Sequence, residues 1–221
     1  MEVLLVGVFT SAGALAGAGG RVLLGRLHRG TRVTPGWCEG ATGLLWTVLG
    51  LRVAGGGGPP WWWLPVPLAL AWLAVLLTVV DLRHRRLPDA LTLPAYPVLA
   101  VLIAVAAAGG AGWPLVARAV AGALLFWGVH AMVRRLVPGS LGAGDVKLAG
   151  VLGAVLGVLG WAALALAAVG AAVVTLVLLL AAPARVSRRW RTGVPHGPGL
   201  LAATWLIAAF PGAALLSEGW L

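Results

Sequence analysis

The longest apolar stretch of the chain is too long to form a single membrane helix. From Val146 to Ala182, 37 residues follow one another with almost no polar side chain among them. One helix of that length would measure about 55 Å, against about 30 Å for the hydrocarbon core of a bilayer. It would also carry the four arginines between 185 and 191 to the side opposite the other basic clusters. We therefore predict two shorter crossings joined by a turn near Gly160 and Trp161.

Apolar runs of this kind make up most of the chain. Of its 221 residues, 61% are hydrophobic and 10% are charged, and the mean hydropathy is +0.99, far from the values of soluble domains. About eight crossings would use about 160 residues and leave too few for a soluble domain. We predict an all-α, polytopic helical membrane protein with about eight transmembrane helices. They are expected at about 3–25, 41–54, 62–80, 90–108, 114–133, the two halves of 146–182, and 199–216. The segment 41–54 is short for a crossing and could be tilted or partly interfacial.

The basic residues indicate how these helices are oriented. The net charge is +10, but the lysines and arginines form short clusters between apolar runs, without the interleaved aromatic residues of a nucleic-acid surface. With an external N-terminus retained as the first span, 14 of the 16 basic residues fall on the cytoplasmic side, and the exceptions are Arg52 and Arg118. The run Trp61 to Trp63 is predicted at the outer interface. The expected partner is therefore membrane lipid, with no nucleic acid.

Cysteine and histidine do not indicate a metal site or a cofactor. Cys38 is the single cysteine, which excludes an intrachain disulfide and a zinc site with several cysteine ligands. The four histidines show no pair at the spacing of four that places two ligands on one helix face. We predict no metal and no cofactor.

Two of the six acidic residues are candidates for chemistry. A carboxylate beside a long apolar run costs several kcal/mol unless it is paired or lies at the membrane edge. The predicted topology puts Asp81, at the inner end of one crossing, and Asp145, at the inner start of another, at the same membrane surface. Two carboxylates about 4 Å apart repel by about 4 kcal/mol at an effective dielectric near 20, so one should hold a proton while the other is ionised. Aspartic proteases use such a pair to activate water.

The residues around this pair have competing interpretations. In the stretch G-A-G-D from Gly142, the two glycines, Gly142 and Gly144, are expected to adopt positive φ and to lie close to a substrate strand. Taken alone, this pattern is equally compatible with a structural helix cap. Asp89 is predicted as the N-cap of the next helix, with proton relay or substrate contact as the alternative. Lys147 either extends to the interface or binds an acidic group of the substrate.

Glycines also recur at helical spacing after Asp145. Gly150, Gly153, Gly157 and Gly160 would form a smooth stripe that another helix can approach closely. The helix that begins at Asp145 is therefore expected to be buried in the bundle.

Three stretches, in this order, resemble the motifs of the type IV prepilin leader peptidases. VVDLRHRRLPDALTLP (79–94) is similar to the motif of the first aspartate, LGAGDVKLAGVLGAVLG (141–157) to that of the second, and VPHGPGLLAA (194–203) to a late P-F-G-P segment. The resemblance implies that Asp81 and Asp145 are the catalytic pair. It implies an aspartic endopeptidase of the bacterial inner membrane that cleaves the leader of prepilins or pilin-like secretion proteins at the cytoplasmic face.

The chain departs from that family at two places. His196 stands where the family commonly has phenylalanine. Bifunctional members carry two C-x-x-C pairs in the first cytoplasmic loop and methylate the new N-terminus, whereas this loop holds only Cys38. We therefore expect peptidase activity without methyltransferase activity. Residues 1–60 are interpreted as N-terminal membrane segments with a short basic loop, and 61–221 as the peptidase-like core.

Two other functions are compatible with a pair of membrane aspartates. One is a GxGD intramembrane protease of different specificity, which would cut deep in a substrate span instead of at the membrane edge. The other is a proton-coupled transporter in which Asp81 and Asp145 carry protons. Many transporters have two similar halves with broken helices, and the sequence shows no such repeat.

Overall fold

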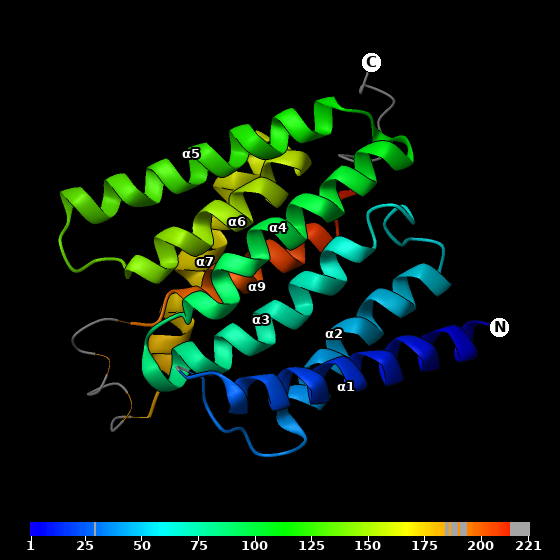
Figure 1. The fold of residues 1–221 in the computed structure, drawn as a ribbon, viewed down its shortest axis with the longest axis horizontal. Coiled ribbons are helices and arrows are strands. Elements are labelled where there is room, and N and C mark those ends of the chain that lie inside the picture. The colour runs from blue at the N-terminus through cyan, green and yellow to red at the C-terminus, as the bar shows by residue number, and fades with distance from the viewer. Residues whose placement is uncertain (29, 184–185, 187–189, 191–193, 213–221) are drawn as a thin grey trace.

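The protein folds as a bundle of helices that run back and forth along a common direction (Figure 1). A computed structural model of the chain describes residues 1–28, 30–183, 186, 190 and 194–212. The helices within these residues are α1 (Glu2–Arg26), α2 (Trp37–Ala54), α3 (Pro65–His84), α4 (Asp89–Ala106) with a π-helical extension η1 (Ala107–Ala111), α5 (Pro114–Leu136), α6 (Ala143–Leu159), α7 (Trp161–Ala181) and α9 (Gly197–Ala209). No strand occurs in this part of the chain. The predicted all-α fold is confirmed.

Five of the described helical segments are long and apolar enough to cross a membrane. They are α1, α3, the stretch Asp89–Gly109, α5 and α7. The prediction of a polytopic membrane protein is thereby confirmed. The remaining helices differ from the five in length or polarity: α6 has 17 residues, α9 has 13, and α2 carries Glu39 and Arg52 near its two ends. Residues 213–216 of the predicted last crossing lie outside the described residues.

The long apolar stretch is divided as predicted. α6 ends at Leu159, α7 begins at Trp161, and Gly160 between them has φ +117° and ψ 164°. L-amino acids with a side chain rarely adopt this conformation, so a glycine is needed at this turn.

Helix α6 lies in the centre of the bundle, where α5 packs closely against it. A Cβ atom on Gly153 would lie 2.6 Å from the Gly122 carbonyl oxygen, and one on Gly157 would lie 2.8 Å from the Gly122 Cα atom. The two backbones can therefore touch only because both helices carry glycine at the crossing. Nearly every residue of α6 after Lys147 is buried. The predicted burial of the helix that carries Asp145 is confirmed.

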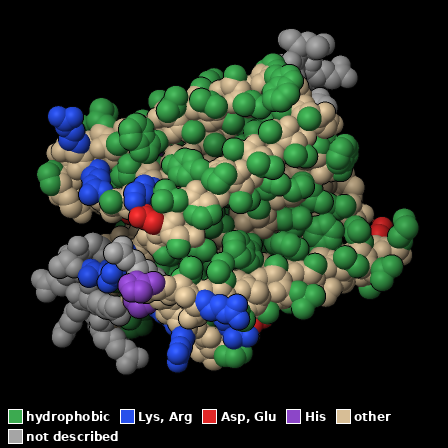
Figure 2. Space-filling view, viewed as in Figure 1, with side chains coloured by type: hydrophobic (Ala, Val, Ile, Leu, Met, Phe, Trp, Pro, Cys, Tyr) green, Lys and Arg blue, Asp and Glu red, His purple; other side chains and the backbone are tan. Residues whose placement is uncertain are grey.

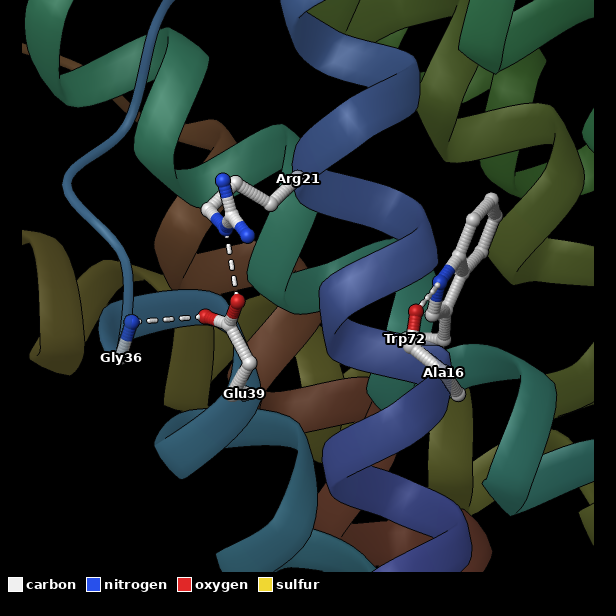
Figure 3. Close-up of polar contacts among 5 residues, drawn as sticks. All are labelled: Ala16, Arg21, Gly36, Glu39 and Trp72. Carbon is white, nitrogen blue, oxygen red and sulfur yellow. Dashed lines mark hydrogen bonds and ion pairs between the residues drawn. The ribbon is translucent and has the colours of Figure 1, made fainter.

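Helices α1 and α2 form a hairpin. Polar contacts join its two helices to each other and to α3 (Figure 3). Arg21 Nε lies 2.6 Å from Glu39 Oε1, and the Gly36 backbone N–H donates to Glu39 Oε2 at 2.9 Å. Trp72 of α3 donates its indole N–H to the carbonyl oxygen of Ala16 at 2.9 Å. The side chain of Glu39 thus closes the loop before α2, and α3 holds the hairpin in place.

The tryptophan run has two different environments. Trp61 is exposed, as expected of an interfacial residue, but Trp63 is fully buried and donates its indole N–H to the carbonyl oxygen of Ala208 at 3.0 Å. Trp63 thus packs inside the bundle, and the position of the run at the outer interface stays a prediction. Its buried hydrogen bond joins the segment before α3 to the end of α9.

The two candidate aspartates lie at the same end of the bundle. The loops α3–α4 and α5–α6 are together at this end, away from the N-terminus (Figure 1). Lys and Arg side chains gather at the same end on the face shown in Figure 2. Of the residues in the predicted basic clusters, 29, 185, 188, 189 and 191 lie outside the described residues. Asp81 in the last turn of α3 and Asp145 in the first turn of α6 therefore belong to the basic end of the molecule.

Candidate active site

Asp81 is buried in the last turn of α3. Its side chain is 4% exposed. The helix ends at His84 because Arg85 adopts a left-handed conformation with φ 52°, and the Arg85 backbone N–H donates to the carbonyl oxygen of Asp81 at 2.7 Å. This turn directs the chain away from α3 immediately after the aspartate.

Asp145 is held by the start of its own helix. It is the third residue of α6, its side chain is 9% exposed, and its Oδ2 accepts the backbone N–H of Gly142 at 3.1 Å. A side chain bonded back to the N-cap residue in this way satisfies one of the free N–H groups of a helix start. The bond engages Oδ2 and fixes the orientation of the carboxyl group.

Gly197, the first residue of α9, lies between the two carboxyl groups. A Cβ atom on this residue would be 2.8 Å from Asp81 Oδ2 and 3.5 Å from Asp145 Oδ1. The two oxygens can therefore be no further apart than the sum of these distances. One water with hydrogen bonds of about 2.8 Å joins oxygens up to about 5.6 Å apart. The limit of about 6.3 Å is only slightly greater than this bridging length, so the two oxygens lie beside one small space next to Gly197.

The oxygen of Asp81 that faces Asp145 has no protein partner among the described residues. Asp81 Oδ2 is buried and accepts no hydrogen bond there, whereas the backbone N–H of Gly197 is placed to donate to the Asp81 carboxyl group. A buried oxygen without a partner is costly. The arrangement therefore favours a proton or a water between the two carboxyl groups.

The two aspartates open into a pocket of about 260 Å³. Besides Asp81 and Asp145 it is lined by Arg85, Arg86, Leu87, Asp89, Gly142, Ala143, Gly144 and Lys147. A larger hollow of about 590 Å³ lies between α2, α3 and α9, but its lining is almost entirely apolar and contains no carboxylate. The smaller pocket is thus the one that carries the acid and base groups.

The supporting glycines have a different role from the predicted one. Neither adopts positive φ; Gly142 has φ −70°. A Cβ atom on Gly142 would lie 3.0 Å from Asp145 Oδ2, and one on Gly144 would lie 2.9 Å from the Cβ atom of Leu87. The expectation of positive φ is wrong. The glycines are needed for space, one beside the aspartate and the other under the α3–α4 loop.

The predicted N-cap role of Asp89 is also wrong. The N-cap residue of α4 is Pro88, and Asp89 Oδ1 lies 2.8 Å from Lys147 Nζ. Tyr96 of α4 donates its hydroxyl to the carbonyl oxygen of Lys147 at 2.7 Å. Lys147 is therefore paired with an acid of the protein itself. Both side chains are about half exposed, so this pair joins α4 to α6 with little net stabilisation.

Two further features of the site were not predicted from the sequence. One is the position of Gly197 between the carboxyl groups, and the other is a hydrogen bond between His196 and Thr175 that precedes it. The similarity of 194–203 to a late family motif marked the region, but nothing in that stretch specified which groups it faces.

The fold and the site together define a polytopic helical membrane protein with two buried carboxyl groups that line one pocket at one end of the bundle. The sequence profile of the type IV leader peptidase family matches residues 68–181, which is more than half of the chain and contains both Asp81 and Asp145. The chain belongs to the type IV leader peptidase family and is a peptidase of this general kind. No curated protein and no solved structure matches it. The resemblance seen in the sequence is confirmed.

Proposed function

We propose that the protein is an aspartic endopeptidase that removes the leader of type IV prepilins or of pilin-like secretion proteins. The observation that carries the proposal is the buried Oδ2 of Asp81, which has no hydrogen-bond partner among the described residues and lies beside the same small space as Oδ1 of Asp145. Two carboxyl groups this close and this buried cannot both be ionised without strong repulsion, so the pair holds one proton. Membership in the leader peptidase family supports a prepilin-type substrate.

In the proposed reaction the two carboxyl groups act together on one water. The ionised carboxylate takes a proton from the water, whose oxygen attacks the scissile carbonyl carbon, while the protonated carboxyl gives its proton to the carbonyl oxygen. The resulting diol collapses when a proton passes to the amide nitrogen and the C–N bond breaks. The products are a leader with a free carboxylate and a mature protein with a new amino group. The shared proton is a property of the pair and not of one residue.

The location of the pair favours cleavage at the cytoplasmic face of the bacterial inner membrane. Asp81 follows the apolar part of α3, and Asp145 precedes the apolar part of α6, at the end where Lys and Arg side chains gather (Figure 2). Basic residues at membrane borders are most frequent on the cytoplasmic side. In this proposal the residues 61–221 form the peptidase core, and the hairpin within 1–60 supports it.

Mass spectrometry of the mature product tests the substrate and the reaction together. When the purified protein is incubated with a type IV prepilin, we expect a product shortened by the leader. The new N-terminus should be unmethylated whether or not a methyl donor is added. The physical reason is that Cys38 is the single cysteine and is buried, so the first loop cannot form the four-cysteine site of the bifunctional members. An uncut prepilin would contradict the proposed function, and an added methyl group would contradict the restriction to peptidase activity.

A further inference from the structure

The start of α9 is fastened to α7 by a hydrogen bond between two side chains. His196 Nδ1 lies 2.9 Å from Thr175 Oγ1, and the Thr175 hydroxyl donates to the carbonyl oxygen of Ala171 at 2.7 Å. A hydroxyl has a single hydrogen, so Thr175 Oγ1 accepts from His196 and the proton of the ring is on Nδ1. Burial lowers the pKa of His196, and the neighbouring His130 on α5 lowers it further. The ring is therefore neutral near pH 7, with Nε2 as an acceptor.

A glycine on α9 leaves the space that this hydrogen bond needs between α7 and α9. A Cβ atom on Gly199 of α9 would lie 2.8 Å from Thr175 Oγ1 and would also meet the carbonyl oxygen of Ala171. Thr175 is the only residue of α7 with a hydroxyl group, in a helix that is otherwise apolar. The hydroxyl therefore occupies a close contact between α7 and α9 that glycine makes room for.

His196 is directly joined to the residue that lies between the aspartates. It is the N-cap residue of α9, and its carbonyl oxygen accepts the backbone N–H of Leu200 at 3.1 Å. The next residue is Gly197, whose N–H is placed to donate to Asp81 and whose missing side chain leaves the space beside Asp145 Oδ1. A displacement of the His196 ring thus moves Gly197 relative to both carboxyl groups.

We propose that His196 is a positioning residue for leader cleavage, that Thr175 is its anchor, and that both act through the Gly197 backbone on the Asp81 carboxyl group. This inference rests on the proposed function, because its readout is cleavage of a prepilin. His196 does not touch the reacting atoms in this account; it sets the position of the N–H that favours the ionised form of the pair.

Four variants of the full-length protein test the proposal, with a type IV prepilin as substrate. In Thr175→Val and His196→Leu the hydrogen bond is lost at nearly constant volume, whereas Thr175→Ser and His196→Asn keep a hydroxyl and an N–H donor. We expect the first two to lower kcat by roughly tenfold, because small displacements of catalytic groups are costly. KM should stay within about twofold, and the acid limb of the kcat/KM profile should move to higher pH. The second two should keep the kcat and the pH profile of the wild type.

The alternative is a purely structural bond between α7 and α9. In that case Thr175→Val and His196→Leu would reduce the amount of folded protein, while the folded fraction would keep the wild-type kcat and pH profile, and the proposal would be wrong. It would also be wrong if Thr175→Ser and His196→Asn lost as much activity as the other two. A wild-type protein that leaves the prepilin uncut would instead overturn the proposed function, and this inference with it.

Discussion

Replacing either Asp81 or Asp145 with asparagine should abolish prepilin cleavage while the protein still inserts and accumulates. Asparagine has almost the same shape as aspartate, and at 145 its side-chain oxygen can still accept the backbone N–H of Gly142. It cannot ionise, so it can neither remove a proton from water nor share one with its neighbour. Each variant should be slower than the wild type by at least about 10³-fold, since loss of one member disables the pair. The measurement is the initial rate of prepilin cleavage by purified protein at matched concentrations.

The matched control for this prediction is Glu39→Gln. Glu39 also forms polar contacts near a helix start, with Arg21 and the Gly36 N–H, but it belongs to the α1–α2 hairpin (Figure 3). This variant should cleave within about threefold of the wild type, because the partly exposed Arg21–Glu39 pair lies outside the pocket that holds Asp81 and Asp145. Normal cleavage by Asp81→Asn or Asp145→Asn would show that the pair does not perform the reaction.

The variant Gly197→Ala should lose activity without losing its fold. The added methyl group would lie 2.8 Å from Asp81 Oδ2, 3.4 Å from Leu87 Cδ2 and 3.5 Å from Asp145 Oδ1, in the space where we place the water. Alanine is also a better helix former than glycine by about 1 kcal/mol, so the first turn of α9 has no reason to unfold. We expect kcat to fall by roughly 100-fold or more, with thermal stability retained, because a small misplacement at the reacting groups is sufficient for such a loss.

Gly19→Ala provides the control for the added methyl group. Gly19 lies on α1, and a Cβ atom there meets no other atom within 4 Å. Its kcat should match that of the wild type, and its thermal stability should be equal or higher, because alanine favours the helix. If Gly197→Ala were as active as Gly19→Ala, the space beside the two carboxyl groups would not be needed for catalysis.

Much of the architecture could be predicted from the distribution of apolar and basic residues. The turn at Gly160 followed from the length of one apolar run and the arginines beyond it, and the structure has it where it was predicted. The same reasoning put Asp81 and Asp145 on one side of the molecule, and the structure has both at one end of the bundle. These predictions succeed because the thickness of a bilayer and the cost of charges within it act on a chain of any sequence.

The local contacts of the site could not be predicted in this way. Asp89 resembled an N-cap because it follows a proline before an apolar run, but Lys147, 58 positions later, pairs with it. Gly142 and Gly144 were interpreted by their backbone freedom, although what they provide is room for a carboxyl group and for Leu87. Such roles depend on which helices meet in space, and neither propensity nor periodicity contains that information.

The position of Gly197 is the clearest example of this limit. It lies 116 positions after Asp81 in the sequence, and the stretch around it shows only that a helix begins at a Gly-Pro pair. The signal that could have indicated its surroundings is Thr175, the lone hydroxyl in α7, together with His196 at the start of α9. Two isolated polar side chains next to apolar helices need partners, and here they are each other's partner.

The proximity of Asp81 and Asp145 is the central claim, and thiol cross-linking in native membranes measures it most directly. The test variant combines Asp81→Cys and Asp145→Cys in a Cys38→Ala background. The control variant combines Asp81→Cys and Glu2→Cys in the same background, with its two thiols at opposite ends of the bundle. We predict that a short bifunctional thiol reagent joins positions 81 and 145 within one chain and does not join positions 81 and 2. If the thiols at 81 and 145 each react with a monofunctional reagent but are never joined, the two residues do not form a pair and the account is wrong.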